Sequence, residues 1–175
     1  PEIWIKRDDC TGLAMGGNKV RKLEFLMGRA LAEGASRVGT FGALQSNHAR
    51  QTAAAAAAVG IDCDLVLTEA VPRDDTDYLR NGNQTLFRIL GATTHTVRAE
   101  TDAAAAISAI EDGAANAGQI VSWFPTGGSS PVGALGYVAA AIELVEQAVE
   151  AEVGFHRIAA ATSTGGTSAG LLAGM

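Results

Sequence analysis

A lysine stands at the start of an expected helix, where its positive charge is out of place. Lys19 follows two glycines and Asn18, a good N-cap residue, so it falls in the first helical turn. A cation is disfavoured there because the N-terminus of a helix carries partial positive charge. Arg21 and Lys22 add to this charge. The cluster indicates a nearby anion and a lysine whose lowered pKa suits an amine nucleophile, with a solvated basic face as the alternative.

Residues 163–167 have the composition of a phosphate-binding turn. Thr164 and Thr167 bring hydroxyls, while Gly165 and Gly166 let the backbone turn inward toward an anion. The turn lacks the Gly-Lys-Ser/Thr of a Walker loop and the spacing of a dinucleotide fingerprint. A plain helix start is the alternative reading. A phosphate cup without a nucleotide fingerprint raises the question of a smaller phosphorylated cofactor.

A third polar group lies at another expected helix start. Gln45, Ser46, Asn47 and His48 offer two amides, a hydroxyl and an imidazole. Ser46 and His48 are too close in sequence to face each other on a helix, which argues against a catalytic triad. Simple N-capping is the alternative for Ser46 and Asn47. A fourth loop, 127–130, is rich in glycine and serine.

The elements that must position these loops alternate along the chain. Short strand-like runs precede longer helical runs, and the loops fall where a strand ends and a helix begins. This alternation predicts an α/β fold, with open, twisted, mostly parallel sheets and helices on both faces. Ligands bind such sheets at the carboxyl ends of the strands. The expected strands are 2–6, 37–41, 63–67, 93–97, 120–124 and 157–161, and the expected helices begin near residues 18, 46, 82, 102, 133 and 167.

Composition narrows the class of protein. The 175 residues are 47% hydrophobic, which excludes intrinsic disorder, and two cysteines exclude a disulfide scaffold. Cys10 and Cys63 lack metal-ligand spacing, so we expect two small buried side chains and no metal site. A net charge of −6 argues against a nucleic-acid partner. No apolar stretch approaches the roughly 18–20 residues of a membrane span, and no signal-peptide pattern is visible, so we expect a cytoplasmic protein without a membrane partner.

Taken together, the loops resemble one enzyme family. Residues 16–24, 45–51 and 128–137 are similar to the D-cysteine desulfhydrase / 1-aminocyclopropane-1-carboxylate (ACC) deaminase family. The similarity runs from Ile3 to the C-terminus. The resemblance implies a pyridoxal-phosphate enzyme with the tryptophan-synthase-β fold, known as fold type II, acting on a small amino acid.

The resemblance also implies residue roles. Lys19 matches the lysine that forms the internal Schiff base with pyridoxal 5'-phosphate and shuttles the α-proton of the substrate. Asn47 matches the asparagine that hydrogen-bonds the ring hydroxyl, and Ser46 matches a serine beside the substrate carboxylate, flanked by Gln45 and His48. The loop that grips the cofactor phosphate is matched by Thr164, Gly165, Gly166 and Thr167.

Two local features favour the desulfhydrase branch of the family. His48 and the run 128–131 look more like that branch than like ACC deaminases. The expected reaction is α,β-elimination from a small sulfur-containing amino acid: D-cysteine to pyruvate, sulfide and ammonia, or the L-cysteate sulfo-lyase reaction. ACC deamination is an alternative. A non-catalytic anion- or nucleotide-binding module, or an inactive fragment, is another.

The resemblance implies a larger assembly than this chain. Family members are longer, with a short segment before the residue matching Pro1 and a further α/β half that supplies tyrosines near the substrate and the partner of the pyridine nitrogen. We therefore expect a truncated chain. Residues 22–130 would form the smaller, mobile domain, and 1–21 with 131–175 would belong to the larger cofactor-binding domain. A homodimer is the expected state of the full-length form.

Overall fold

A four-stranded parallel sheet organises the first part of the molecule. The computed structural model describes residues 2–69, 71–98 and 100–175. The strand order is β3-β2-β1-β4, and every pairing is parallel. Arg37 pairs with Asp62 on one side of β1 and with Val121 on the other. The α/β prediction is confirmed. The strands are β1 (Arg37–Ala43), β2 (Asp62–Thr68), β3 (Thr93–Val97) and β4 (Val121–Phe124).

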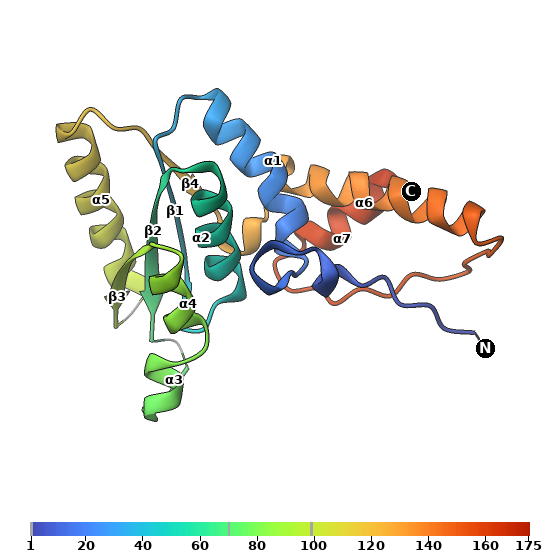
Figure 1. The fold of residues 1–175 in the computed structure, drawn as a ribbon, viewed down its shortest axis with the longest axis horizontal. Coiled ribbons are helices and arrows are strands. Elements are labelled where there is room, and N and C mark those ends of the chain that lie inside the picture. Colours follow the sequence, from blue (N-terminus) through green and yellow to red (C-terminus); the bar gives the residue numbers. More distant parts are fainter. Residues whose placement is uncertain (1, 70, 99) are drawn as a thin grey trace.

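Helices connect the strands and extend beyond them (Figure 1). Parallel strands need such crossover connections. Ser46 and Ser130 cap α2 and α6, because each side chain accepts a hydrogen bond from a backbone N–H of its first turn. The helices are α1 (Lys19–Ala32), α2 (Asn47–Val59), α3 (Thr76–Arg80), α4 (Asn83–Ile89), α5 (Glu100–Asn116), α6 (Pro131–Glu150) and α7 (Gly166–Gly174), with single 3-10 turns η1 (Asp8–Cys10), η2 (Leu13–Met15) and η3 (Thr126–Gly128).

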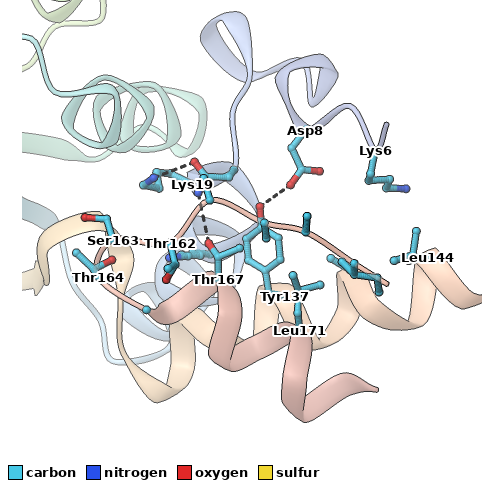
Figure 2. Close-up of a pocket in the computed structure, with 18 residues that line it drawn as sticks. Lys6, Asp8, Lys19, Tyr137, Leu144, Thr162, Ser163, Thr164, Thr167 and Leu171 are labelled. Carbon is cyan, nitrogen blue, oxygen red and sulfur yellow. Dashed lines mark hydrogen bonds between the residues drawn. The ribbon is translucent and has the colours of Figure 1, made fainter. Parts of the chain in front are cut away.

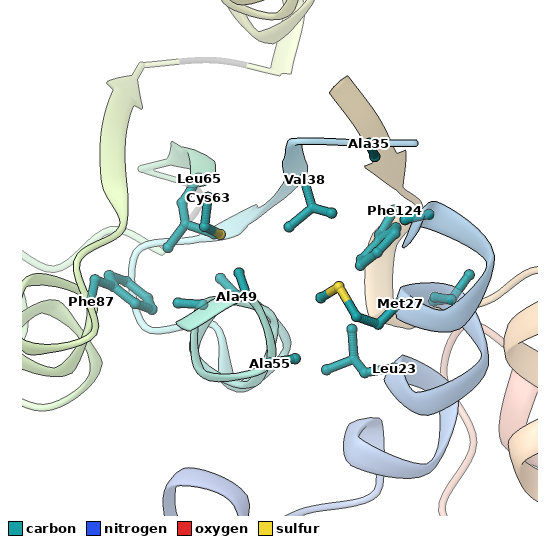
Figure 3. Packing of buried hydrophobic residues seen from close by; sticks show 14 of the residues in the cluster. Leu23, Met27, Ala35, Val38, Ala49, Ala55, Cys63, Leu65, Phe87 and Phe124 are labelled. Atoms are coloured by element: carbon teal, nitrogen blue, oxygen red, sulfur yellow. The ribbon is translucent and has the colours of Figure 1, made fainter. Parts of the chain in front are cut away.

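The core lies between one face of the sheet and helices α1, α2 and α4 (Figure 3). Val38, Leu65 and Phe124 point from that face and are fully buried. The alanine run of α2 packs on them: Ala53 and Ala56 are both completely inaccessible, since a methyl side chain lets a helix lie close to a sheet. Helix α5 covers β2 and β3 on the opposite face, so helices lie on both faces as predicted.

Beyond α1, helices α6 and α7 form a second packed group (Figure 1). Small residues let these helices approach closely. A Cβ added at Gly136 of α6 would lie 2.0 Å from the backbone oxygen of Arg21 in α1. One at Gly170 of α7 would lie 2.4 Å from the oxygen of Ala134 in α6. These contacts hold the starts of α1 and α7 beside each other.

Two strand predictions are wrong. Residues 2–6 and 157–161 are extended but form no ladder within the described residues. A strand needs a hydrogen-bonded neighbour, and local β-propensity does not supply one. The side chains of Ile3 and Ile158 are accordingly exposed. Of the two cysteines expected to be buried, Cys63 is buried and Cys10 is exposed.

The expectation that no apolar stretch approaches the length of a membrane span is wrong for helix α6. Its 20 residues have a mean hydropathy of 1.4, so by length and composition it is able to cross a bilayer. It is the one such helix among the described residues, and a single helix of this kind does not distinguish a membrane span from a core helix. Here it packs against α1 and α7.

Candidate active site

The starts of α1 and α7 line one cavity of about 460 Å³ (Figure 2). Lys19 and Asn18 reach it from the start of α1, and Tyr137 from α6. The loop before α7 forms another side. The sequence-predicted Lys19, Thr164, Gly165 and Thr167 are thus brought together, although about 145 residues separate the two segments. Ser46, Asn47, Gln45 and His48 are not among the residues lining this cavity.

Lys19 is half-buried at the first position of α1. Its Nζ donates a hydrogen bond to Oδ1 of Asn18 at 2.8 Å, and burial lowers the pKa of the amine. The Asn18 side chain therefore does not cap the helix. The cap comes from α2, where Gln51 Oε1 accepts the backbone N–H of Val20 at 3.0 Å. This contact ties the start of α1 to the neighbouring helix.

Lys22 is a second site lysine, which the sequence analysis treats only as added charge. Its side chain is fully buried, and its Nζ donates to the Gly127 carbonyl at 3.2 Å and to Ser129 Oγ at 3.3 Å. Burial, and then the charge of Lys19, lower its pKa to about 8. Its spacing from Lys19 was the available signal, because residues three apart share a helix face.

The start of α7 meets Lys22 across a narrow gap. A Cβ added at Gly166 would lie 2.6 Å from Ser129 Oγ and 3.0 Å from Lys22 Nζ. Glycine here leaves room between a helix N-terminus and an ammonium, both of which favour a phosphate. Thr164 Oγ1 hydrogen-bonds Ser129 Oγ at the mouth of the same loop. These residues fit a phosphate ester, and their role in binding one stays a prediction.

His48 is buried at the start of α2 and fixed in one tautomer. Its Nε2 lies 2.9 Å from Thr40 Oγ1, and that hydroxyl donates to the Phe124 carbonyl at 2.9 Å. Because the hydroxyl hydrogen is committed to the carbonyl, Nε2 must carry a hydrogen. Nδ1 is buried, and no hydrogen-bond partner for it is found among the described residues. Burial first, then the charges of Lys19 and Lys22, lower the pKa of His48 to about 4, so the ring is neutral at pH 7.

Gln45 and Ser46 differ in whether their side chains keep a hydrogen-bond donor for a ligand. Gln45 donates from Nε2 to the Asn81 carbonyl at 3.0 Å and accepts from the Asn83 backbone N–H at 2.9 Å, so both ends of its amide hold the junction between α3 and α4. Ser46 Oγ accepts the Ala49 N–H at 3.2 Å and keeps its own hydrogen to donate. The substrate-binding roles of both residues stay predictions.

Arg50 is a buried cation that the sequence analysis missed. It is 8% exposed, and its guanidinium donates to oxygens of Gly16, Asn47 and Asn83, all uncharged. Among the described residues, Lys19, Lys22 and Arg50 make no salt bridge with a carboxylate. Buried charges are normally paired, so the unpaired lysines beside the start of α7 call for a bound anion, while Arg50 is held by neutral oxygens alone. No local sequence pattern marks an arginine as buried.

The comparisons with known proteins agree with this chemistry. Residues 1–175 match the family of pyridoxal-phosphate dependent enzymes, and the chain belongs to it. The cofactor of that family, pyridoxal phosphate, carries a phosphate ester and a ring hydroxyl, and the residues around Gly166, Lys22 and Lys19 suit its phosphate and its aldehyde.

Two curated relatives are D-cysteine desulfhydrases. The one from Serratia proteamaculans is 42% identical over 174 residues, and the one from Salmonella typhi is 44% identical; each match covers 99% of this chain and 53% of the relative. The chain therefore spans about half the length of the curated relatives it matches. The resemblance to this family is confirmed.

Solved structures give the same fold. A crystal structure of an ACC deaminase homologue superposes with a TM-score of 0.82 at 42% identity, covering 97% of this chain and 50% of that one. A hydrogen sulfide-producing enzyme from Fusobacterium nucleatum superposes with a TM-score of 0.72 at 16% identity, covering 98% of this chain and 49% of that one. The second likeness bears on the fold alone, which is that of the fold-type II enzymes.

Proposed function

We propose that this chain is the cofactor-lysine half of a pyridoxal-phosphate lyase that performs α,β-elimination on a small sulfur-containing amino acid, with D-cysteine as the preferred substrate and L-cysteate as the second. The observation that carries the proposal is a pair of lysines, half-buried Lys19 and fully buried Lys22, which lie near the start of α7 and make no salt bridge with a carboxylate of the described residues. The 42–44% identity to D-cysteine desulfhydrases supports the substrate.

Lys19 is assigned the amine chemistry. Burial lowers its pKa, which raises the share of the unprotonated, nucleophilic amine near neutral pH. Once released, the same amine is placed to move a proton at the α-carbon of the substrate. When bound, pyridoxal phosphate supplies an electron sink for the charge left on that carbon.

Holding the cofactor is assigned to the loops around Lys19. Residues 164–167 and Lys22 take the phosphate, through the N-terminus of α7 and an ammonium. Asn47 takes the ring hydroxyl. Ser46, with Gln45 and His48 beside it, takes the substrate carboxylate at the start of α2, where unpaired N–H groups favour an anion.

The wider arrangement is part of the same proposal. Residues 22–130 act as a smaller domain that moves against 1–21 and 131–175. The grouping of α2–α5 around the sheet and of α6 with α7 supports this division. The full-length protein is proposed to be a cytoplasmic homodimer that binds neither nucleic acid nor membrane; the net charge of −6 of this chain supports the absence of a nucleic-acid partner.

ACC deamination is the second candidate, favoured by the likeness to the ACC deaminase homologue. Its substrate has no sulfur, so the products separate the two reactions. The protein containing this chain should release sulfide and pyruvate from D-cysteine faster than it releases 2-oxobutyrate from ACC. The reverse order would replace the proposal.

The cofactor linkage tests the assignment of Lys19. The protein is loaded with pyridoxal phosphate and reduced with borohydride, and the modified peptide is located by mass spectrometry. The label should fall on Lys19. Lys22, three residues away, is an internal control, since both lysines line the cavity but only Lys19 is proposed to bond to the cofactor. A label on Lys22, or none on either lysine, would overturn the assignment.

A further inference from the structure

Arg50 carries a buried charge that has no carboxylate partner among the described residues. Its Nη1 donates to Oδ1 of Asn47 at 3.2 Å and Oδ1 of Asn83 at 3.3 Å, and its Nη2 donates to the Gly16 carbonyl at 3.0 Å. Nε is buried and has no hydrogen-bond partner in the part of the chain that the structure describes. Arg50 therefore forms no ion pair that would offset the cost of burying its charge. Its role is to be sought in the groups that carry the three acceptor oxygens.

The amide of Asn47 is fixed in one orientation by this network. Its Oδ1 accepts from Arg50 and also from Asn83 Nδ2 at 3.0 Å. A flipped amide would set its NH₂ against two donors. Asn83 is fixed in the same way, because its Nδ2 also donates to the Gln45 carbonyl at 2.8 Å while its Oδ1 faces Arg50.

The exposed Asn47 side chain therefore has one free polar end. Nδ2 is not engaged in any hydrogen bond found in the described part of the chain, so it remains a donor for a ligand oxygen. Its N–H bonds are polarised by the positive charge behind the carbonyl end, which makes them better donors to an oxyanion.

The same guanidinium also reaches the loop that carries Lys19. Gly16 has φ +64 and no space for a side chain, since a Cβ there would lie 2.2 Å from the Asp9 carbonyl. Three residues later comes Lys19. Arg50 thus spans the amide at the start of α2 and the backbone before the lysine, and it sets their separation.

We infer that Arg50 is a positioning residue, which turns the NH₂ of Asn47 toward the ring oxygen of the cofactor, favours the deprotonated form of that oxygen, and fixes Asn47 relative to the Lys19 loop. The inference rests on the proposed function, in which Asn47 takes the ring hydroxyl. Its own content is that Arg50 acts on the cofactor through Asn47 and not by direct contact.

A double-mutant cycle tests this indirect action. The variants Arg50→Met, Asn47→Ala and the double substitution are made in the protein containing this chain. Pyridoxal phosphate affinity is measured by titration, and the absorption spectrum of the loaded protein reports the protonation of the ring oxygen. Arg29→Met, which removes an exposed arginine of α1, is the matched charge control.

Arg50→Met should let the Asn47 amide turn away and so remove its hydrogen bond to the charged ring oxygen, which should weaken cofactor binding roughly tenfold. Absorption should shift from the long-wavelength band toward the near-ultraviolet, because the ring oxygen is then more often protonated. Asn47→Ala should do the same. In the Asn47→Ala background, removing Arg50 should add less than about twofold, because its route to the cofactor is gone. Arg29→Met should change neither quantity.

Full additivity of the two substitutions, or a wild-type spectrum in Arg50→Met, would overturn the inference. If Arg50→Met does not fold, Arg50→Lys carries the test. It keeps the charge but cannot reach Asn47 and Gly16 together, so it should weaken binding to an intermediate degree, and wild-type affinity would contradict the proposal. A wild-type protein that binds no pyridoxal phosphate would instead remove the proposed function itself.

Discussion

The first turns of α1 carry two sets of cations that differ in their ion pairing: Arg21 alone, and the lysines Lys19 and Lys22. Arg21 is paired with Asp8 at 2.8 Å and with Glu143 at 2.7 Å, and it joins the N-terminal segment to α6. Lys19 and Lys22 make no salt bridge with a described residue, although Asp8 lines the same cavity; their amines donate to the uncharged oxygens of Asn18, Gly127 and Ser129.

The difference separates structural charge from functional charge. Arg21 has its anions within the chain, and those carboxylates raise its pKa further above the usual range. Lys22 is buried beside another cation, and its pKa falls to about 8. An arrangement that leaves a buried cation unpaired costs stability, so it indicates a ligand. The predictions below test whether the two sets behave differently.

Removing Lys19 should have the largest effect. Lys19→Ala eliminates both the amine that joins the cofactor and the proposed proton carrier, so sulfide release from D-cysteine should fall by about 10³-fold or more. Steady-state rates measure this loss. Arg21→Met is the control on the same helix, and it should keep activity within a few-fold once the protein is folded. Equal losses in both variants would erase the distinction.

Removing Lys22 should weaken the grip on the phosphate. Lys22→Met deletes an ammonium beside the start of α7, and pyridoxal phosphate affinity should fall roughly 10- to 100-fold. Pyridoxal, which lacks the phosphate, is the matched ligand, and its affinity should barely change. In the cofactor-free protein the variant should melt no lower than the wild type, since a buried unpaired charge is gone. An equal loss for both ligands would place Lys22 elsewhere in the site.

Removing Arg21 should affect the fold and leave the site intact. Arg21→Met breaks two charge-assisted contacts and leaves Asp8 and Glu143 without their arginine, so the free energy of unfolding should fall by about 2–3 kcal/mol. Denaturant unfolding of the cofactor-free protein measures the change. The affinity for pyridoxal phosphate should stay within twofold. A loss of affinity like that of Lys22→Met would contradict the assignment.

The same contrast explains what sequence predicted and what it missed. The parallel sheet, Lys19 and the 164–167 turn follow from local patterns: alternation, an N-cap position and a glycine-hydroxyl turn. Whether a charge is paired depends on residues far along the chain, as with Arg21 and Glu143 or Arg50 and Gly16. That information is not local, so Lys22 registers only as charge and Arg50 not at all.

The failed strands have a related cause. Residues 2–6 and 157–161 carry β-branched and apolar side chains, but a strand exists only where a neighbour hydrogen-bonds to it. The successful strands, such as Asp62–Thr68, have partners on both sides within the described residues. β-Propensity is similar in the paired and the unpaired segments, so only the presence of a hydrogen-bonded neighbour distinguishes them.

A pH dependence of stability should also separate the two sets of cations. The pKa of Lys22 is about 8 in the folded protein and near 10.5 when unfolded, so between those values the unfolded state binds more protons. Stability of the cofactor-free protein should therefore rise with pH in this window, by at most about 1.4 kcal/mol per pH unit for one proton. Arg21 has a raised pKa and contributes nothing there.

Comparing variants isolates this contribution, because other groups also titrate above pH 8. The difference in unfolding free energy between the wild type and Lys22→Met should grow in favour of the wild type from pH 8 to 10.5. The difference for Arg21→Met should stay flat. Bound phosphate raises the pKa of Lys22, since an anion favours the protonated amine. The affinity for pyridoxal phosphate should therefore fall as pH rises over the same range. A flat difference for Lys22→Met would mean that the lysine already has an anionic partner in the cofactor-free protein, and the contrast between the two sets would fail.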